Sequence, residues 1–240
     1  MSRQPVVAGQ FYPSSASQLR TMIEKMVDEA AEKEDVIGLV SPHAGYVYSG
    51  PVAGAVISRV RFKDTFVILG PNHTGRGKPL SIMAQGKWQT PFGDVEIDSE
   101  LAQHLLSITR HLQEDEAAHQ YEHSIEVQLP FLQYFKPDVK IVPITLSFAS
   151  PDAYREIGQE IARAITDTKR EAVIMASSDM THYEPQDIAA SKDRQAIDAI
   201  LRLDEDELLR RVEKHNISCL LYTSDAADEL DGVDLGGRRI

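Results

Sequence analysis

Three short apolar runs, each followed by turn-forming residues and then a histidine, constrain the fold of this chain more than any other feature. The runs and their histidines are residues 36–40 with His43, residues 65–69 with His73, and residues 172–176 with His182. Apolar runs of this length, bounded by Gly, Pro and Ser, are typical of strands buried on both faces of a parallel sheet. Ligands of open α/β sheets bind beyond the carboxyl ends of such strands, so the three imidazoles are expected at one edge of the sheet.

The segments around these runs predict helices that alternate with strands. Apolar residues at helical spacing or helix-start residues mark residues 19–30, 50–60, 98–112, 124–135, 151–165, 188–201 and 205–212. Pro130 is expected to kink the fourth of these helices or to end it early. Residues 80–84 and 93–97, divided by a turn at 89–93, are predicted to form shorter strands or a hairpin, and residues 140–146 a further strand. The alternation indicates an α/β fold: a single three-layer domain whose mostly parallel or mixed sheet has helices on both faces.

Charge and composition narrow the class of partner. The 240 residues carry a formal charge of -12, which argues against a nucleic-acid partner because polyanions are bound by excess Lys and Arg. A single cysteine excludes an intramolecular disulfide and fits a reducing compartment. No run reaches the roughly eighteen apolar residues of a membrane span. We therefore expect a cytoplasmic protein with no membrane partner.

Three imidazoles at one sheet edge suggest a metal site. Neutral histidines are common ligands of iron, zinc and copper. The alternative is that each histidine merely caps a strand through a hydrogen bond. Asp179, three residues before His182, either orients a metal ligand by accepting its hydrogen bond or caps a helix.

A fourth polar cluster, EHSIE at residues 122–126, precedes the apolar stretch at residues 127–131. On a helix Glu122 and Glu126 would share one face. That face either is exposed to solvent or lines the opening of the metal site. The apolar residues that follow favour the second alternative, which would place Glu122 and His123 in the cleft of the metal site.

The remaining histidines and the cysteine are weaker candidates. Cys219 is either a soft metal ligand or a small buried hydrophobe. The polar composition of residues 98–121 predicts surface positions for His104, His111 and His119.

Six motifs along the chain resemble those of one known family. In chain order they are VVAGQFYP, SPHAGYVYSG, LGPNH, TPFGD, EHSIEVQLPFLQ and SSDMTHY. Over roughly residues 4–219 the chain resembles the MEMO family, known in prokaryotes as AmmeMemoRadiSam system protein B. The resemblance implies a fold related to that of class III extradiol dioxygenases, such as the LigB-type catalytic subunit. In those enzymes two histidines and a carboxylate hold Fe(II), and a further histidine acts as acid/base.

The resemblance also implies roles for individual residues. His43 and His73 match the two histidine ligands, and His182 matches the acid/base histidine. Cys219 matches a family cysteine in the third ligand position, and its soft thiolate makes Cu(I) an alternative to Fe(II). After Cys219 the sequence departs from the family pattern. We therefore expect a MEMO-like domain over residues 1–219 that lacks its closing segment, followed by an unrelated tail, residues 220–240, that is disordered or artefactual.

Three functions remain open at this point. The first is a non-haem iron oxidoreductase of dioxygenase type that acts on an unknown small substrate, with His182 as its catalytic residue. The second is a non-catalytic module that binds a metal or a peptide. The third is an accessory protein of a radical SAM partner. Oxygen uptake with catechols would favour the first function, and a neighbouring radical SAM gene would favour the third.

Overall fold

The computed structural model describes residues 2–217. Within these residues nine strands form one sheet in the order β1-β5-β6-β8-β3-β9-β2, with β4 beside β8 and β7 beside β4. The strands are β1 (Ser2–Arg3), β2 (Gly38–Ser41), β3 (Thr65–Pro71), β4 (Leu80–Ile82), β5 (Lys87–Thr90), β6 (Gly93–Ile97), β7 (Gln113–Glu114), β8 (Lys140–Leu146) and β9 (Ala172–Ser177). The helices are α1 (Ala16–Glu24), α2 (Tyr46–Ser58), α3 (Ser99–Ile108), α4 (Ala117–Gln120), the 3-10 turn η1 (Glu126–Gln128), α5 (Leu129–Phe135), α6 (Pro151–Thr168), α7 (Gln186–Leu201) and α8 (Glu205–His215).

The strands that precede the three histidines are parallel neighbours, as predicted. β3 pairs in parallel with β8 on one side and with β9 on the other, and β9 pairs in parallel with β2. Phe66, Val67 and Ile68 of β3 are at most 1% exposed. A strand in the middle of the sheet is covered on both faces, and this is why its sequence is a continuous apolar run rather than an alternating one.

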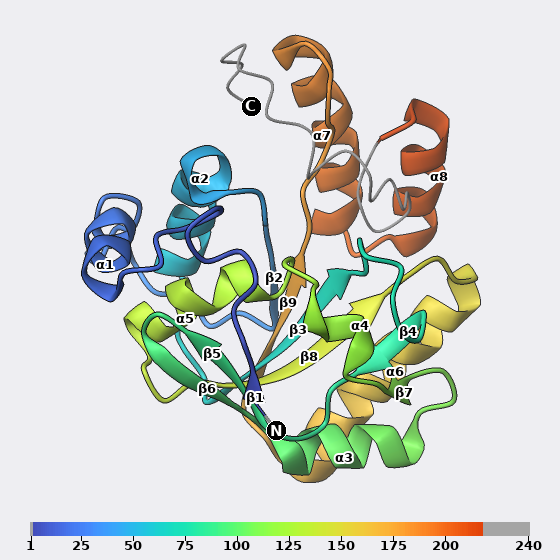
Figure 1. Ribbon diagram of the computed structural model, residues 1–240. Helices are drawn as coiled ribbons and strands as arrows, with labels where there is room; N and C mark the ends of the chain where they lie inside the picture. The colour runs from blue at the N-terminus through green and yellow to red at the C-terminus, as the bar shows by residue number, and fades with distance from the viewer. Residues whose placement is uncertain (1, 218–240) are drawn as a thin grey trace.

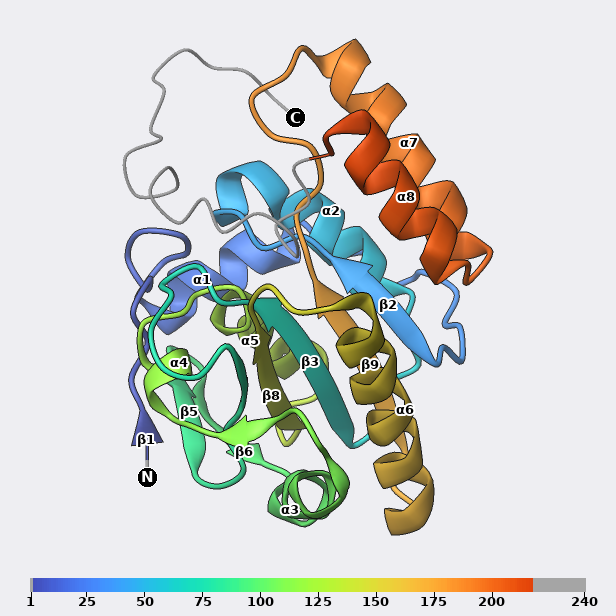
Figure 2. The same cartoon turned by 90° about the vertical axis from the view of Figure 1, so that its right-hand side faces the viewer.

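Helices cover both faces of the sheet. α1, α2 and α5 lie on one face, and α3 and α6 lie on the other (Figures 1 and 2). Ile57 of α2 and Ile157 and Ile161 of α6 are buried in the core. α7 and α8 pack against each other beyond the end of β9 (Figure 1). The predicted α/β class and its layers are therefore confirmed. None of the helices in residues 2–217 combines the length and apolar character that a membrane crossing requires.

The predicted starts of α3 and α6 are correct, whereas the first strand of the hairpin and the end of the first helix differ from the prediction. Asp98 caps α3 by accepting the N–H of Leu101, and Ser150 caps α6. A hairpin does form before α3, but its first strand is β5 rather than residues 80–84. The first helix ends at Glu24, earlier than its apolar spacing predicted.

The helix predicted over residues 124–135 is the clearest correction. Only α5 is α-helical, and residues 126–128 form the 3-10 turn η1. Pro130 lies in the first turn of α5, where its missing N–H has no helical partner to lose, so it begins the helix rather than kinking it. Glu122 and Glu126 therefore do not share a helix face, and Glu122 and His123 lie in a loop between α4 and η1.

Candidate metal centre

His43 and His73 emerge at the same edge of the sheet. His43 follows the end of β2 by two residues, and His73 follows the end of β3 by two residues. Both side chains are buried. Their ring centroids lie 5.2 Å apart, and the rings meet edge to face. The strand ends thus bring together two imidazoles that are thirty residues apart in the chain.

His123 joins this pair from the loop before η1. Its ring stacks on His73, with centroids 4.6 Å apart, and meets His43 at 5.7 Å. One ring nitrogen from each of the three histidines lies within 4.8 Å of the other two. Sequence reasoning placed His123 in the cleft but gave it no ligand role, because the motif resemblance supplied a cysteine for the third position.

A buried carboxylate, Glu122, holds His73 in place. Glu122 Oε2 accepts the backbone N–H of His73 at 2.6 Å, and Oε1 lies 2.8 Å from His73 Nδ1 and 3.7 Å from His123 Nδ1. Burial alone would raise the pKa of Glu122, but the hydrogen bond and charge of His73, with the charge of His123, hold that pKa well below its ordinary value. The ionised carboxylate only accepts hydrogen bonds, so His73 Nδ1 carries the proton. His73 Nε2 is left with its lone pair, buried and without a hydrogen-bond partner among residues 2–217.

Asp179 connects the imidazole group to His182. It follows the end of β9 by two residues, and its Oδ1 accepts the backbone N–H of His43 at 2.7 Å. Its Oδ2 lies 3.9 Å from His43 Nε2 and 3.8 Å from His182 Nε2. Burial raises the pKa of Asp179, but His43 and His182 lower it more, so the net shift is downward. His182 therefore lies beside the group of three, across a carboxylate that is ionised at neutral pH.

The loop that carries Glu122 and His123 is fixed by a buried charge network. The Arg3 guanidinium donates to Glu126 Oε2 at 2.7 Å and to the backbone carbonyl of Glu122 at 2.5 Å. Glu126 also accepts the backbone N–H of Val7 and the Tyr12 hydroxyl. Sequence reasoning assigned no role to this network. The one local sequence feature that could have indicated the network is the pair of carboxylates in EHSIEVQLP, because these charges directly border a buried apolar stretch.

His119 and Cys219 are not part of the described imidazole group. His119, predicted at the surface, is buried, so that prediction is wrong. Its Nε2 lies 3.1 Å from the Ser81 hydroxyl, and its carbonyl accepts a hydrogen bond from Arg3. Cys219, expected as the third metal ligand, lies outside the described residues, as does the tail over residues 220–240.

The residues present fit a metal ion by their chemistry. Three neutral imidazoles suit zinc, iron and copper. Histidine ligands in metal sites commonly donate their second ring N–H to a carboxylate, as His73 does to Glu122. Nitrogens bound at roughly 2.0–2.1 Å around a tetrahedral ion lie about 3.3 Å apart. The ligand nitrogens lie within 4.8 Å of one another, so the group would close slightly around an ion.

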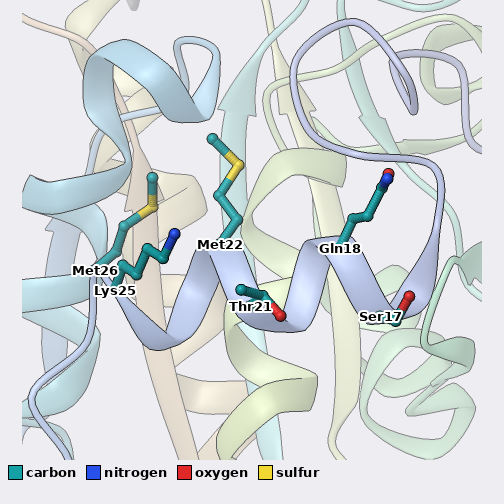
Figure 3. Close-up of a pocket in the computed structure, with 6 residues that line it drawn as sticks. All are labelled: Ser17, Gln18, Thr21, Met22, Lys25 and Met26. Carbon is teal, nitrogen blue, oxygen red and sulfur yellow. The ribbon is translucent and has the colours of Figure 1, made fainter.

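A shallow hollow along α1 is separate from this group. Figure 3 shows its lining side chains. They are Ser17, Gln18, Thr21, Met22, Lys25 and Met26. The lining contains neither a histidine nor a carboxylate, so the hollow offers no metal site of this kind.

Fold and side chains together define an α/β protein with a candidate three-histidine metal site at the carboxyl edge of a parallel sheet. Residues 3–221 match the family model described as Memo-like protein. The chain belongs to this family. A "MEMO1 family protein" of Methanococcoides burtonii is 49% identical over 222 residues, which are 92% of this chain and 83% of the relative. Relatives from Pyrobaculum aerophilum and Methanosarcina mazei are 45% and 43% identical, and the matches cover 90% and 99% of this chain and 81% and 88% of theirs.

Proposed function

We propose that this protein binds one metal ion, Fe(II) or Cu(I), through His43, His73 and His123, and that it acts as a non-haem oxidoreductase of dioxygenase type on a small substrate. The observation that carries the proposal is the buried group of three imidazoles beside the ionised Glu122. A buried imidazole that presents a lone pair to two others has little structural purpose by itself. The buried Nε2 of His73, which has no hydrogen-bond partner among residues 2–217, gains one if a cation or a donor occupies the centre of the group.

Asp179 and His182 would supply the proton chemistry of such an oxidoreductase. When bound, the ion would supply Lewis acidity and redox capacity. His182 is more open than the three grouped imidazoles, with 18% of its side chain exposed, so it can meet both a substrate and solvent. It would hold or release a proton at Nε2, and the Asp179 carboxylate at 3.8 Å would stabilise its protonated form.

A binding module without turnover is the second candidate. It is favoured by the burial of all three grouped imidazoles, none more than 8% exposed. Catalytic metal sites keep an open coordination position, whereas structural ones are closed. Oxygen uptake by the metal-loaded protein with a panel of catechols separates the two functions. Turnover that is lost in His182→Ala, while metal content stays unchanged, supports the oxidoreductase.

Metal content is the experiment that tests the proposal. We expect anaerobically purified protein to hold about one ion per chain, and His43→Ala, His73→Ala and His123→Ala each to lose it, because a three-ligand site rarely survives the loss of one ligand. His119→Ala is the matched control, since His119 is equally buried but lies outside the group. Equal metal retention in all four variants, each shown to be folded by circular dichroism, would refute the proposal.

A further inference from the structure

Ser177, the last residue of β9, contacts His43 at Nδ1, whereas the other ring nitrogen, Nε2, lies 3.9 Å from Asp179 Oδ2. The Ser177 Oγ lies 3.1 Å from His43 Nδ1, and both residues are fully buried. We propose that Ser177, oriented by Gln128, is a positioning residue that keeps the proton of His43 on Nδ1 and so presents the Nε2 lone pair to a metal ion. The consequence for metal binding rests on the proposed function, but the position of the proton does not.

The Gln128 side chain in η1 has one amide orientation that satisfies its contacts. Its Nε2 lies 2.9 Å from the carbonyl oxygen of Pro42 and 3.4 Å from that of Ser41. Its Oε1 accepts the Ser41 hydroxyl at 2.8 Å. Backbone carbonyls only accept hydrogen bonds, so a flipped amide would set its oxygen against two other oxygens. The amide N–H groups of Gln128 therefore face Pro42 and Ser177.

The Ser177 hydroxyl has a single proton to donate. The hydroxyl lies 2.6 Å from the backbone carbonyl of Ser124, which can only accept, and 2.9 Å from Gln128 Nε2, which can only donate. The proton must therefore go to Ser124. The remaining lone pair of the hydroxyl faces His43 Nδ1. That nitrogen has to be the donor, because no second proton is available on Ser177.

The hydrogen bond from His43 Nδ1 to Ser177 fixes the tautomer of the His43 ring. With a proton on Nδ1, a neutral imidazole has its lone pair on Nε2. A free histidine side chain in water prefers the opposite tautomer, so the buried contacts impose this one. Glu122 does the same for His73 through a carboxylate. The two strand-end imidazoles are thus held in the same tautomer by different partners, a neutral hydroxyl for His43 and an anion for His73.

Nitrogen-15 NMR of the histidine rings in the metal-free protein tests the tautomer directly. At a pH where the rings are neutral, we expect His43 to carry its proton on Nδ1 in the wild type. Ser177→Ala should lose this preference and populate the Nε2–H form. Ser81→Ala is the matched control, because the Ser81 hydroxyl likewise donates to a carbonyl, that of Asp115, and meets an imidazole nitrogen, that of His119. It should leave His43 unchanged. A wild-type His43 protonated on Nε2, or no change in Ser177→Ala, would overturn the assignment.

Metal affinity, measured by competition with a chromophoric chelator, tests the consequence. Loss of a residue that orients a metal-bound histidine typically weakens affinity by about 10- to 100-fold. We expect a loss of this size in Ser177→Ala, partial recovery in Ser177→Thr, which keeps the hydroxyl, and no loss in Ser81→Ala. Equal affinity in wild type and Ser177→Ala would overturn the positioning role. A wild type that binds no metal yet shows the Nδ1–H tautomer would overturn the proposed function and support the tautomer assignment.

Discussion

At the residue scale, His119 shows how burial decides the chemistry of a side chain. Burial, with the nearby charge of Arg3, lowers the pKa of His119 from 6.5 to about 3, so the ring is neutral in the folded protein at any pH above that. The sequence around His119 is polar and predicted a surface position. The residues that bury it, Arg3 and Ser81, are 116 and 38 positions away, so no local pattern could have signalled them.

His119 should make the fold sensitive to moderate acid. Between pH 6.5 and about 3 the unfolded chain binds a proton at His119 that the folded chain does not. The stability contribution is therefore fully present above pH 6.5 and falls by about 1.4 kcal/mol for each unit of pH below it. His119→Gln should lose this slope, so its free energy of unfolding in urea should fall less than that of the wild type between pH 6.5 and 5. Parallel pH profiles for the two proteins would contradict the assignment.

At the scale of elements, the strand ends could be predicted but the loop between them could not. The apolar runs at residues 36–40, 65–69 and 172–176 indicated strands buried on both faces. This is correct for β3 but not for β2, an edge strand in which Gly38 is exposed and Leu39 and Val40 are only half-buried. Parallel pairing places the residues that follow these strands, His43, His73 and Asp179, at one edge. His123 arrives on the loop before η1. The position of that loop depends on the pairing of Arg3 with Glu126 across 123 residues, a contact with no periodicity to read.

The Arg3–Glu126 pair should matter most when only one partner is removed. Both side chains are almost completely buried, so Arg3→Met alone leaves an uncompensated buried carboxylate and should cost roughly 3–5 kcal/mol of stability. Adding Glu126→Gln removes that charge, and the double variant should be more stable than Arg3→Met. Urea unfolding of the two single variants and the double variant measures the coupling. A double variant whose cost equals the sum of the single costs would show that the pair is not coupled.

At the scale of the whole molecule, the three grouped imidazoles come from distant parts of one domain. Residues 43, 73 and 123 belong to segments that follow β2, β3 and α4. An ion bound by all three would be bound by the folded chain far better than by the unfolded one.

Metal should therefore stabilise the entire fold. At a free metal concentration 100 times the dissociation constant, linkage predicts a gain of about 2.7 kcal/mol in the free energy of unfolding. The unfolding temperature should rise with added metal and return to the metal-free value with a chelator. His73→Ala should show no such rise, whereas His111→Ala, a half-buried histidine paired with Glu156, should respond like the wild type. A metal-induced rise of equal size in His73→Ala would place the ion elsewhere.

The most direct test of the central claim is X-ray absorption spectroscopy of the metal-loaded protein. Binding through His43, His73 and His123 predicts three imidazole nitrogens at roughly 2.0–2.1 Å, with the multiple scattering that imidazole rings produce. Removing His123 should take one of these nitrogens away. A sulfur scatterer at about 2.3 Å would identify Cys219 as a further ligand. A first shell without imidazole scattering, or one that is unchanged in the doubly substituted His43→Ala, His73→Ala protein, would contradict the claim that these imidazoles hold the metal.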